Sequence, residues 1–79
     1  MFRYLLMQER LVDLEIGAYE TFGVRIVDDA NTEIRVISDI SLEKNVVLQL
    51  CEDCNRFELD PIHIDDVIED LFAFLAKTP

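Results

Sequence analysis

The chain is short and strongly acidic: 17 of its 79 residues are Asp or Glu and 7 are Lys or Arg, giving a formal net charge of −10 at pH 7. Such a charge repels phosphate backbones and anionic lipid headgroups, so it argues against binding to nucleic acid or to a membrane surface. Since 51% of the residues are hydrophobic, we expect one ordered domain, although a chain of this length buries only about 60% of its unfolded surface and has a thin core.

The apolar run at the N-terminus is too short for a signal peptide. Tyr4–Met7 is apolar, but Gln8–Arg10 ends the run before it reaches the length of a signal-peptide core. No other stretch approaches the roughly 20 apolar residues of a membrane span. We therefore expect a cytoplasmic protein in which Cys51 and Cys54 stay reduced and form no disulfide.

Alternating apolar residues predict three strands in the first half of the chain. In residues 2–12 and 18–28, large apolar side chains recur at every second position, which is typical of strands. A third strand is expected at 32–38, after the turn-forming sequence Asp28–Asn31. Short connections favour an antiparallel meander. Gly23 predicts a bulge, or a place where another backbone or a bulky ring comes close to the second strand.

The hydrophobic period changes near Ile40–Ser41 from that of a strand to that of a helix. A first helix is expected at 42–56, with Ser41 accepting a hydrogen bond from a free N–H at its start and Asn55 ending it. Its apolar stripe, at helical spacing, consists of Val47, Leu50, Cys51 and Cys54.

A second helix is expected at 61–76, because Asp60 suits the cap position and Pro61 the first helical position. Its apolar stripe consists of Ile64, Val67, Ile68, Leu71 and Leu75. Phe72 and Phe74 widen this stripe on either side. Because a small sheet and two helices cannot hide both rings, part of the stripe is expected to face a second copy of the chain in a homodimer.

These elements predict an α+β fold, in which a three-stranded antiparallel β-meander is followed by two α-helices packed on one face. Three segments, Tyr19–Val24, Ile37–Ser41 and above all Leu59–Leu71, resemble in the same order a domain-of-unknown-function family of short clostridial (Firmicutes) proteins. The resemblance spans nearly the whole chain. It implies a small cytoplasmic bacterial protein with hairpin-like strands and two helices, without an assigned activity, substrate or cofactor. Cys51 and Cys54 depart from that family's pattern.

Cys51 and Cys54 have the spacing of a redox or zinc motif. A redox pair needs a helix N-terminus or a cation to stabilise its thiolate, whereas this pair lies late in a predicted helix beside two carboxylates. A structural zinc site needs four ligands, and only His63 and a carboxylate such as Asp60 remain to complete it. Core packing is therefore the favoured interpretation. A metal-binding or thiol-dependent protein that uses Cys51, Cys54 and His63 is the alternative.

His63 falls in the first turn of the second predicted helix, on the same side as Asp66 and Asp70. A His with carboxylates at these spacings is a candidate for general acid–base chemistry or for a metal ion. More often, such a His makes local hydrogen bonds at a helix start, and the chain has neither a second His nor a glycine-rich loop. We expect no catalytic residue, no cofactor and no enzymatic activity.

The second predicted helix carries a candidate partner-binding face. Its carboxylates are Asp65, Asp66, Glu69 and Asp70. Like charges at i,i+4 cost about 0.2–0.5 kcal/mol per pair, and a solvated surface explains them. Uncompensated acid on one face is also what a basic protein partner would recognise. We therefore predict a non-enzymatic interaction or regulatory protein. An acidic decoy for the nucleic-acid site of another protein is a weaker alternative, because the charge is spread over both halves of the chain.

Overall fold

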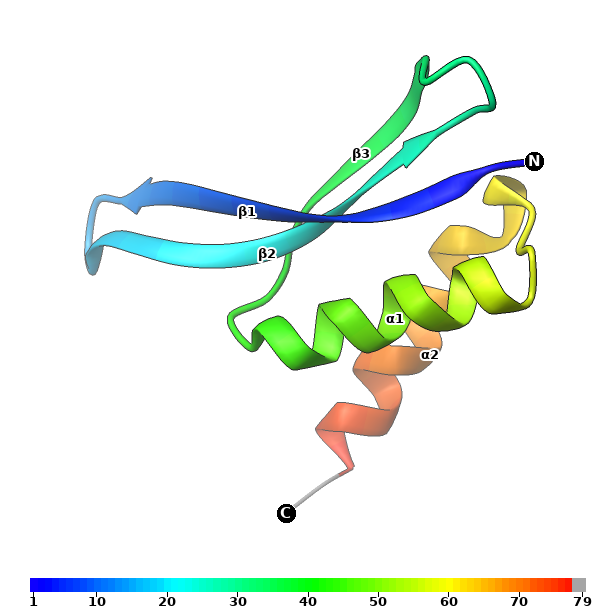
Figure 1. Ribbon diagram of the computed structural model, residues 1–79. Coiled ribbons are helices and arrows are strands. Elements are labelled where there is room, and N and C mark those ends of the chain that lie inside the picture. The colour runs from blue at the N-terminus through cyan, green and yellow to red at the C-terminus, as the bar shows by residue number, and fades with distance from the viewer. Residues whose placement is uncertain (78–79) are drawn as a thin grey trace.

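The computed structural model describes residues 1–77, in which three strands are followed by two α-helices (Figure 1). In chain order the elements are β1 (Arg3–Asp13), β2 (Gly17–Val27), β3 (Glu33–Ser41), α1 (Lys44–Arg56), the 3₁₀ turn η1 (Pro61–His63) and α2 (Ile64–Ala76). The strands pair antiparallel in the order β1-β2-β3, so β1 and β3 are the edges. The α+β fold and the meander predicted from the sequence are confirmed.

β1 and β2 form a long hairpin whose closed end extends beyond the helices (Figure 1). The last pair joins Asp13 to Gly17. A carboxylate oxygen of Asp13 accepts hydrogen bonds from the backbone N–H groups of Glu15 (2.7 Å) and Ile16 (3.1 Å). Gly17 adopts φ +86°, a left-handed conformation that glycine tolerates best. The turn between β1 and β2 is therefore fixed by Asp13 on one side and by Gly17 on the other.

β3 runs three residues beyond the predicted range of 32–38 because it contains a bulge. Val24 of β2 lies opposite Ile37, whereas Phe22, two residues earlier, lies opposite Ser41, four residues later. Two additional residues of β3 are accommodated between these pairs, and Asp39 adopts φ +54° there. The sequence predicts that the strand ends at residue 38, whereas the structure shows that pairing with β2 resumes after the bulge, at Ser41.

Gly23 faces this bulge across the β2–β3 ladder. A Cβ atom added at Gly23 would lie 2.2 Å from the carbonyl oxygen of Ile37 and 3.0 Å from the terminal methyl group of Met7. A backbone oxygen cannot move aside as the end of a flexible side chain can. The prediction that Gly23 permits close approach of another backbone is confirmed.

We predict that Gly23→Ala lowers the free energy of unfolding by about 1–3 kcal/mol, the usual cost of forcing an additional methyl group into a packed site. Urea unfolding followed by circular dichroism measures this loss. Gly17→Asn is the matched control, because no atom lies within 4 Å of the Cβ position at Gly17 and Asn tolerates a positive φ. An unchanged urea midpoint for Gly23→Ala would contradict the close approach.

α1 begins at Lys44, two residues later than predicted. Glu43 occupies the cap position without a side-chain hydrogen bond, and the Ser41 hydroxyl accepts from the backbone N–H of Glu43 (3.0 Å), outside the helix. Ser41 therefore accepts a hydrogen bond from an N–H at the helix start, as predicted, but the donor is the cap residue Glu43, so Ser41 lies two residues before the cap position. The reason is the extended β3, which holds Ser41 in the sheet opposite Phe22.

α1 ends at Arg56, and Asn55 is not the residue that ends it. Glu58 leaves the helix in a left-handed conformation with φ +50°. The N–H of Leu59 donates to the carbonyl of Cys54 (3.0 Å) and that of Glu58 to the carbonyl of Asn55 (3.3 Å). This pair of bonds is a Schellman motif, in which Glu58 stands where glycine is most common.

The predicted second helix, 61–76, divides into two parts. Pro61–His63 form η1, and the α-helical part begins at Ile64. The predicted cap is confirmed, since the Asp60 carboxylate accepts from the backbone N–H of Ile62 (3.0 Å) and Pro61 follows directly.

Both helices lie on the same side of the sheet (Figure 1), and the core is formed between the sheet and the helices. The buried core residues are Tyr4, Val24, Ile26, Ile40, Val47, Leu50, Cys51, Cys54, Ile64 and Ile68. The whole predicted stripe of α1 is buried, and of the stripe of α2 Ile64 and Ile68 are buried and Val67 is half-buried. Within residues 1–77, no helix combines the length and the apolar character needed to cross a bilayer.

Candidate functional site

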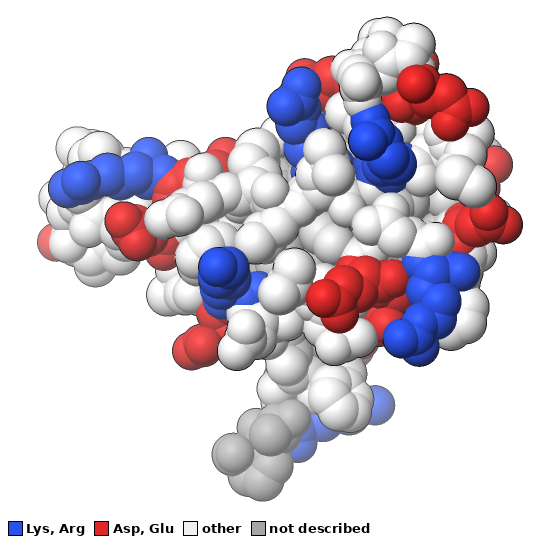
Figure 2. All heavy atoms as spheres, in the orientation of Figure 1, with Lys and Arg blue, Asp and Glu red and all other residues white. Residues whose placement is uncertain are grey.

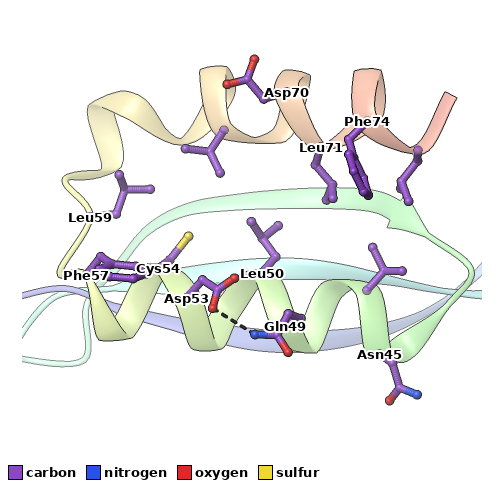
Figure 3. Close-up of a pocket in the computed structure, with 13 residues that line it drawn as sticks. Asn45, Gln49, Leu50, Asp53, Cys54, Phe57, Leu59, Asp70, Leu71 and Phe74 are labelled. Atoms are coloured by element: carbon purple, nitrogen blue, oxygen red, sulfur yellow. Dashed lines mark hydrogen bonds between the residues drawn. The ribbon is translucent and has the colours of Figure 1, made fainter. Parts of the chain in front are cut away.

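An apolar groove of about 630 Å³ lies between α1 and α2 (Figure 3). Its walls are made by Asn45, Val46, Gln49, Leu50, Asp53, Cys54, Phe57, Leu59, Val67, Asp70, Leu71, Phe74 and Leu75. A volume of this size lies within the range of protein ligand sites, which is about 300–1,000 Å³.

Each wall repeats once per helical turn. Val46, Leu50 and Cys54 recur every four residues along α1; Leu50 and Cys54 belong to the buried stripe, and Val46 is half-buried beside it. From α2, Leu71 and Phe74 point into the space opposite them (Figure 3). Because residues at i and i+4 stack on one side of a helix, the same periodicity that builds the core also extends an apolar surface out of it.

The groove is open because α2 leaves the core towards its C-terminal end. Along the stripe of α2 the exposed fraction rises from 0% at Ile64 and 7% at Ile68 to 39% at Leu75. Phe74 is 69% exposed although it lines the groove. The apolar stripe of α2 is therefore longer than the surface that covers it.

Polar side chains border the apolar floor. Asn45, Gln49 and Asp53 follow one another at i, i+4 and i+8 on the α1 side, and Asp70 lies on the α2 side. The Gln49 side-chain amide donates to the Asp53 carboxylate (2.9 Å), which holds that carboxylate at the edge (Figure 3). Among the described residues that line the groove, none is Lys or Arg. The border of the groove is therefore polar and acidic.

The predicted acidic face is less uniform than its sequence indicates. Arg35 of β3 binds the Asp65 carboxylate in a bidentate arrangement, with N–O distances of 2.8 and 2.7 Å. Hydrogen bonding to Arg35 lowers the pKa of Asp65, and the same bond raises the pKa of Arg35. Asp65 thus joins α2 to the sheet. Asp66, Glu69 and Asp70 remain exposed as the acidic part of the helix.

Basic residues do not gather elsewhere on the face shown in Figure 2. Lys and Arg side chains are scattered there among Asp and Glu, with broad uncharged areas between them. Arg25 is paired with Glu33 at 2.9 Å, and the N-terminal ammonium group with Asp29 at 3.1 Å. This face therefore offers no continuous positive patch.

Cys51 and Cys54 are free thiols buried in the core. Burial, with smaller contributions from Cys54 and Glu52, raises the pKa of Cys51 to about 11. Burial and then Asp53 raise the pKa of Cys54. The favoured interpretation of the pair, core packing, agrees with this placement. Within residues 1–77, no three His, Cys, Asp or Glu side chains gather in a geometry that would hold a metal ion.

His63 is exposed at the junction between η1 and α2. Its backbone N–H donates to the carbonyl of Asp60 (3.0 Å), and its side chain makes no capping hydrogen bond to α2. The local side-chain hydrogen bond expected of His63 at the helix start is therefore not formed.

A polar cluster that the sequence did not reveal stabilises the bulge of β3. The Asp39 carboxylate accepts from the hydroxyls of Thr21 (2.7 Å) and Tyr19 (3.2 Å). The Glu9 carboxylate accepts from the hydroxyl of Ser38 (2.7 Å) and from the backbone N–H of Asp39 (3.1 Å). Glu9 of β1 thus binds β3, and Asp39 of β3 binds side chains of β2, which gives the cluster a structural role.

A protein-family model, described as a family of unknown function (DUF6514), matches residues 1–73. The chain belongs to this family. The comparisons with curated proteins and with solved structures gave no match. The family description names no activity, so a proposal for function depends on the geometry of the site.

Sequence reasoning missed most of the α1 side of the groove. Asn45, Gln49 and Asp53 were not singled out, although their spacing places them on one side of the helix beside the apolar stripe. Phe57, an exposed aromatic residue in the link after α1, was a second signal. The separation between the two helices has no signal in any local pattern.

We predict that both thiols of the native protein react slowly with a thiol reagent at pH 8, because they are buried and protonated. The pKa of Cys51 is raised in the folded protein from the ordinary value of about 9 to about 11. Its burial as a neutral thiol therefore contributes fully to stability below pH 9, and this contribution is lost as the pH rises towards 11. Urea unfolding should therefore occur at lower urea above pH 9.

Timed thiol titration in buffer and in denaturant measures the difference in accessibility. Rapid labelling of both residues in buffer, or one zinc ion per chain in the purified protein, would contradict core packing and favour the metal-binding or thiol-dependent alternative.

Proposed function

We propose that the protein is a non-enzymatic protein–protein interaction or regulatory module, and that it docks a basic protein partner. The observation that carries this proposal is the open apolar groove between α1 and α2, bordered by Asp53 and Asp70. Exposed apolar surface with a polar border is typical of interaction sites. The acidic residues on α2 add long-range attraction for a positively charged partner.

The state of the reactive side chains supports a non-enzymatic role. The two thiols are buried with raised pKa values. The carboxylates of Glu9 and Asp39 are occupied by hydrogen bonds within the sheet. His63 is exposed and does not lie among the residues that line the groove.

We also propose that the protein is a small cytoplasmic protein of clostridial origin. The cytoplasmic location is supported by the two free cysteines, since a reducing compartment keeps thiols unpaired. The clostridial origin rests on the segments Tyr19–Val24, Ile37–Ser41 and Leu59–Leu71, which resemble short proteins of that group.

The basic-partner proposal predicts that Glu69→Gln with Asp70→Asn weakens capture of the partner several-fold and leaves the fold intact, because both side chains are exposed. The loss should be largest at low salt, since exposed charges are screened once the Debye length falls well below about 10 Å. A quantitative pull-down from the protein's own cytoplasm at two salt concentrations measures capture.

Glu15→Gln with Glu20→Gln is the matched control for this experiment. It removes the same charge from the exposed hairpin and should leave capture unchanged. Equal capture by both double variants and the wild type, at both salt concentrations, would remove the acidic surface from the proposal.

We further propose that the protein forms a homodimer, with the end of the β1–β2 hairpin in contact with the second copy. Val12, Leu14 and Ile16 are all strongly exposed there, where no helix covers them (Figure 1). Phe72 is also exposed, to 46%, and by helical spacing it lies on the Asp65 side of α2, away from the groove. These side chains add apolar surface that a thin core cannot cover.

We predict that sedimentation at micromolar concentration gives a dimer, and that replacing Val12, Leu14 and Ile16 together by Ser gives a monomer with unchanged far-ultraviolet circular dichroism. The exposed hairpin end makes this replacement tolerable for the fold. A wild-type monomer over the whole concentration range would show the homodimer proposal to be wrong.

A further inference from the structure

We propose that the α1–α2 groove is a receptor for one α-helix of the partner, an amphipathic helix whose apolar side fills the groove and whose flanks carry Lys or Arg. This inference rests on the proposed interaction function and specifies the partner's chemistry. It is carried by the periodicity of the groove walls, by the volume between them and by the charge along their edges.

The walls have the repeat of a helical ligand. Val46, Leu50 and Cys54 place one apolar side chain per turn along about 12 Å of α1, at 1.5 Å per residue. Val67, Leu71 and Phe74 do the same on α2. A third helix presents apolar residues at i, i+3 or i+4, and i+7 with the same rise per turn, so its side chains would enter the spaces between those of the walls.

The volume also suits such an occupant. A groove of about 630 Å³ holds several large side chains and is too wide for one to fill. Its inner surface is supplied mainly by aliphatic side chains and Phe74, with the thiol of Cys54 at the floor (Figure 3). Such a surface gains free energy from apolar burial and makes few demands on hydrogen-bond geometry.

The border selects the sign of the partner's charge. Asp53 lies on the α1 edge, and Asp70 borders the α2 side with its carboxylate directed away from α1 (Figure 3). No Lys or Arg of the described chain lines the groove. Basic residues on the flanks of an inserted helix would lie near Asp53 on one side, and on the other side they would reach Asp70 across the outer edge of α2. A second copy of this chain would instead bring Asp66, Glu69 and Asp70 of its own α2 against an acidic border, which like-charge repulsion opposes.

The structure provides a matched pair of aromatic residues for the test. Phe74 lines the groove, whereas Phe72, two residues away on the same helix, does not. Both are exposed, to 69% and 46%, so replacing either by Ala creates no buried cavity. A helix bound in the groove would lose its contact with the Phe74 ring in Phe74→Ala, whereas Phe72→Ala would leave its contacts with the groove unchanged.

The probe is a synthetic helix of about 14 residues with Leu at i, i+4, i+7 and i+11, Lys at the remaining positions and one Trp among the apolar anchors. The protein contains no Trp, so Trp emission reports the peptide alone. Two comparison peptides serve as controls. The first has the same composition in scrambled order, so that it has no apolar side, and the second has Glu in place of every Lys.

We expect the Lys peptide to bind with a blue shift of its emission, and the scrambled and Glu peptides to bind at least tenfold more weakly. Phe74→Ala should weaken binding of the Lys peptide about tenfold and Phe72→Ala less than twofold. Backbone amide shifts in the wild-type protein should change along α1 and α2 when the peptide is added. This second measurement needs no variant.

Any of three results would overturn the proposal that the groove receives a helix. These are equal binding of the ordered and scrambled peptides, equal effects of Phe74→Ala and Phe72→Ala, and amide shift changes confined to the sheet. Concentration-dependent shifts at the groove without peptide would assign it to a second copy, and binding of an apolar dye with no peptide binding would assign it to a small ligand. The proposed function fails separately, when removal of the acidic charges on Glu69 and Asp70 leaves partner capture unchanged.

Discussion

The arrangement of the helices depends on one contact, between Tyr4 on the edge strand and the end of α1. The Tyr4 N–H donates to the side-chain oxygen of Asn55 (2.8 Å), and the Asn55 amide donates to the Tyr4 carbonyl (2.9 Å). The Tyr4 hydroxyl donates to the carbonyl of Leu59, and burial raises the pKa of Tyr4 to about 12. Because β1 is an edge, these backbone groups have no strand partner. One residue of the sheet thus holds both the last turn of α1 and the link that follows it.

The link sets the direction of α2 and hence the groove. Glu58 takes a left-handed conformation that costs a non-glycine residue about 1–2 kcal/mol, and the two Schellman hydrogen bonds offset that cost. α2 is then held at its first half by Ile64 in the core and by the Asp65–Arg35 pair. In its second half Leu71 is only partly buried against the core, and Phe74 and Leu75 are exposed. The groove opens where the apolar stripe of α2 continues beyond these attachments.

Sequence periodicity predicted the elements well, because a period of two or of 3.6 records which side of each element is buried. Positions at which a polar side chain bonds across the fold were misinterpreted. Asn55 has the composition of a helix end, but its amide pairs with a strand 51 residues away. Ser38 and Asp39 have the composition of a junction, but Glu9 and Thr21 hold them inside a bulged strand. A local sequence pattern cannot show whether a polar side chain is hydrogen-bonded to a distant part of the chain or to solvent.

The candidate site also depends on contacts between segments that are distant in the sequence. The four carboxylates of α2 are evident in the sequence, yet one of them, Asp65, is neutralised from β3 and serves the fold. The apolar part of the site is a property of neither helix alone, because it exists only where Leu50 and Leu71 face each other across a gap. The negative charge therefore predicts attraction of a basic partner, and the distance between α1 and α2 determines which shape of partner fits between them. A surface that combines both properties favours a folded helical ligand over a purely electrostatic one.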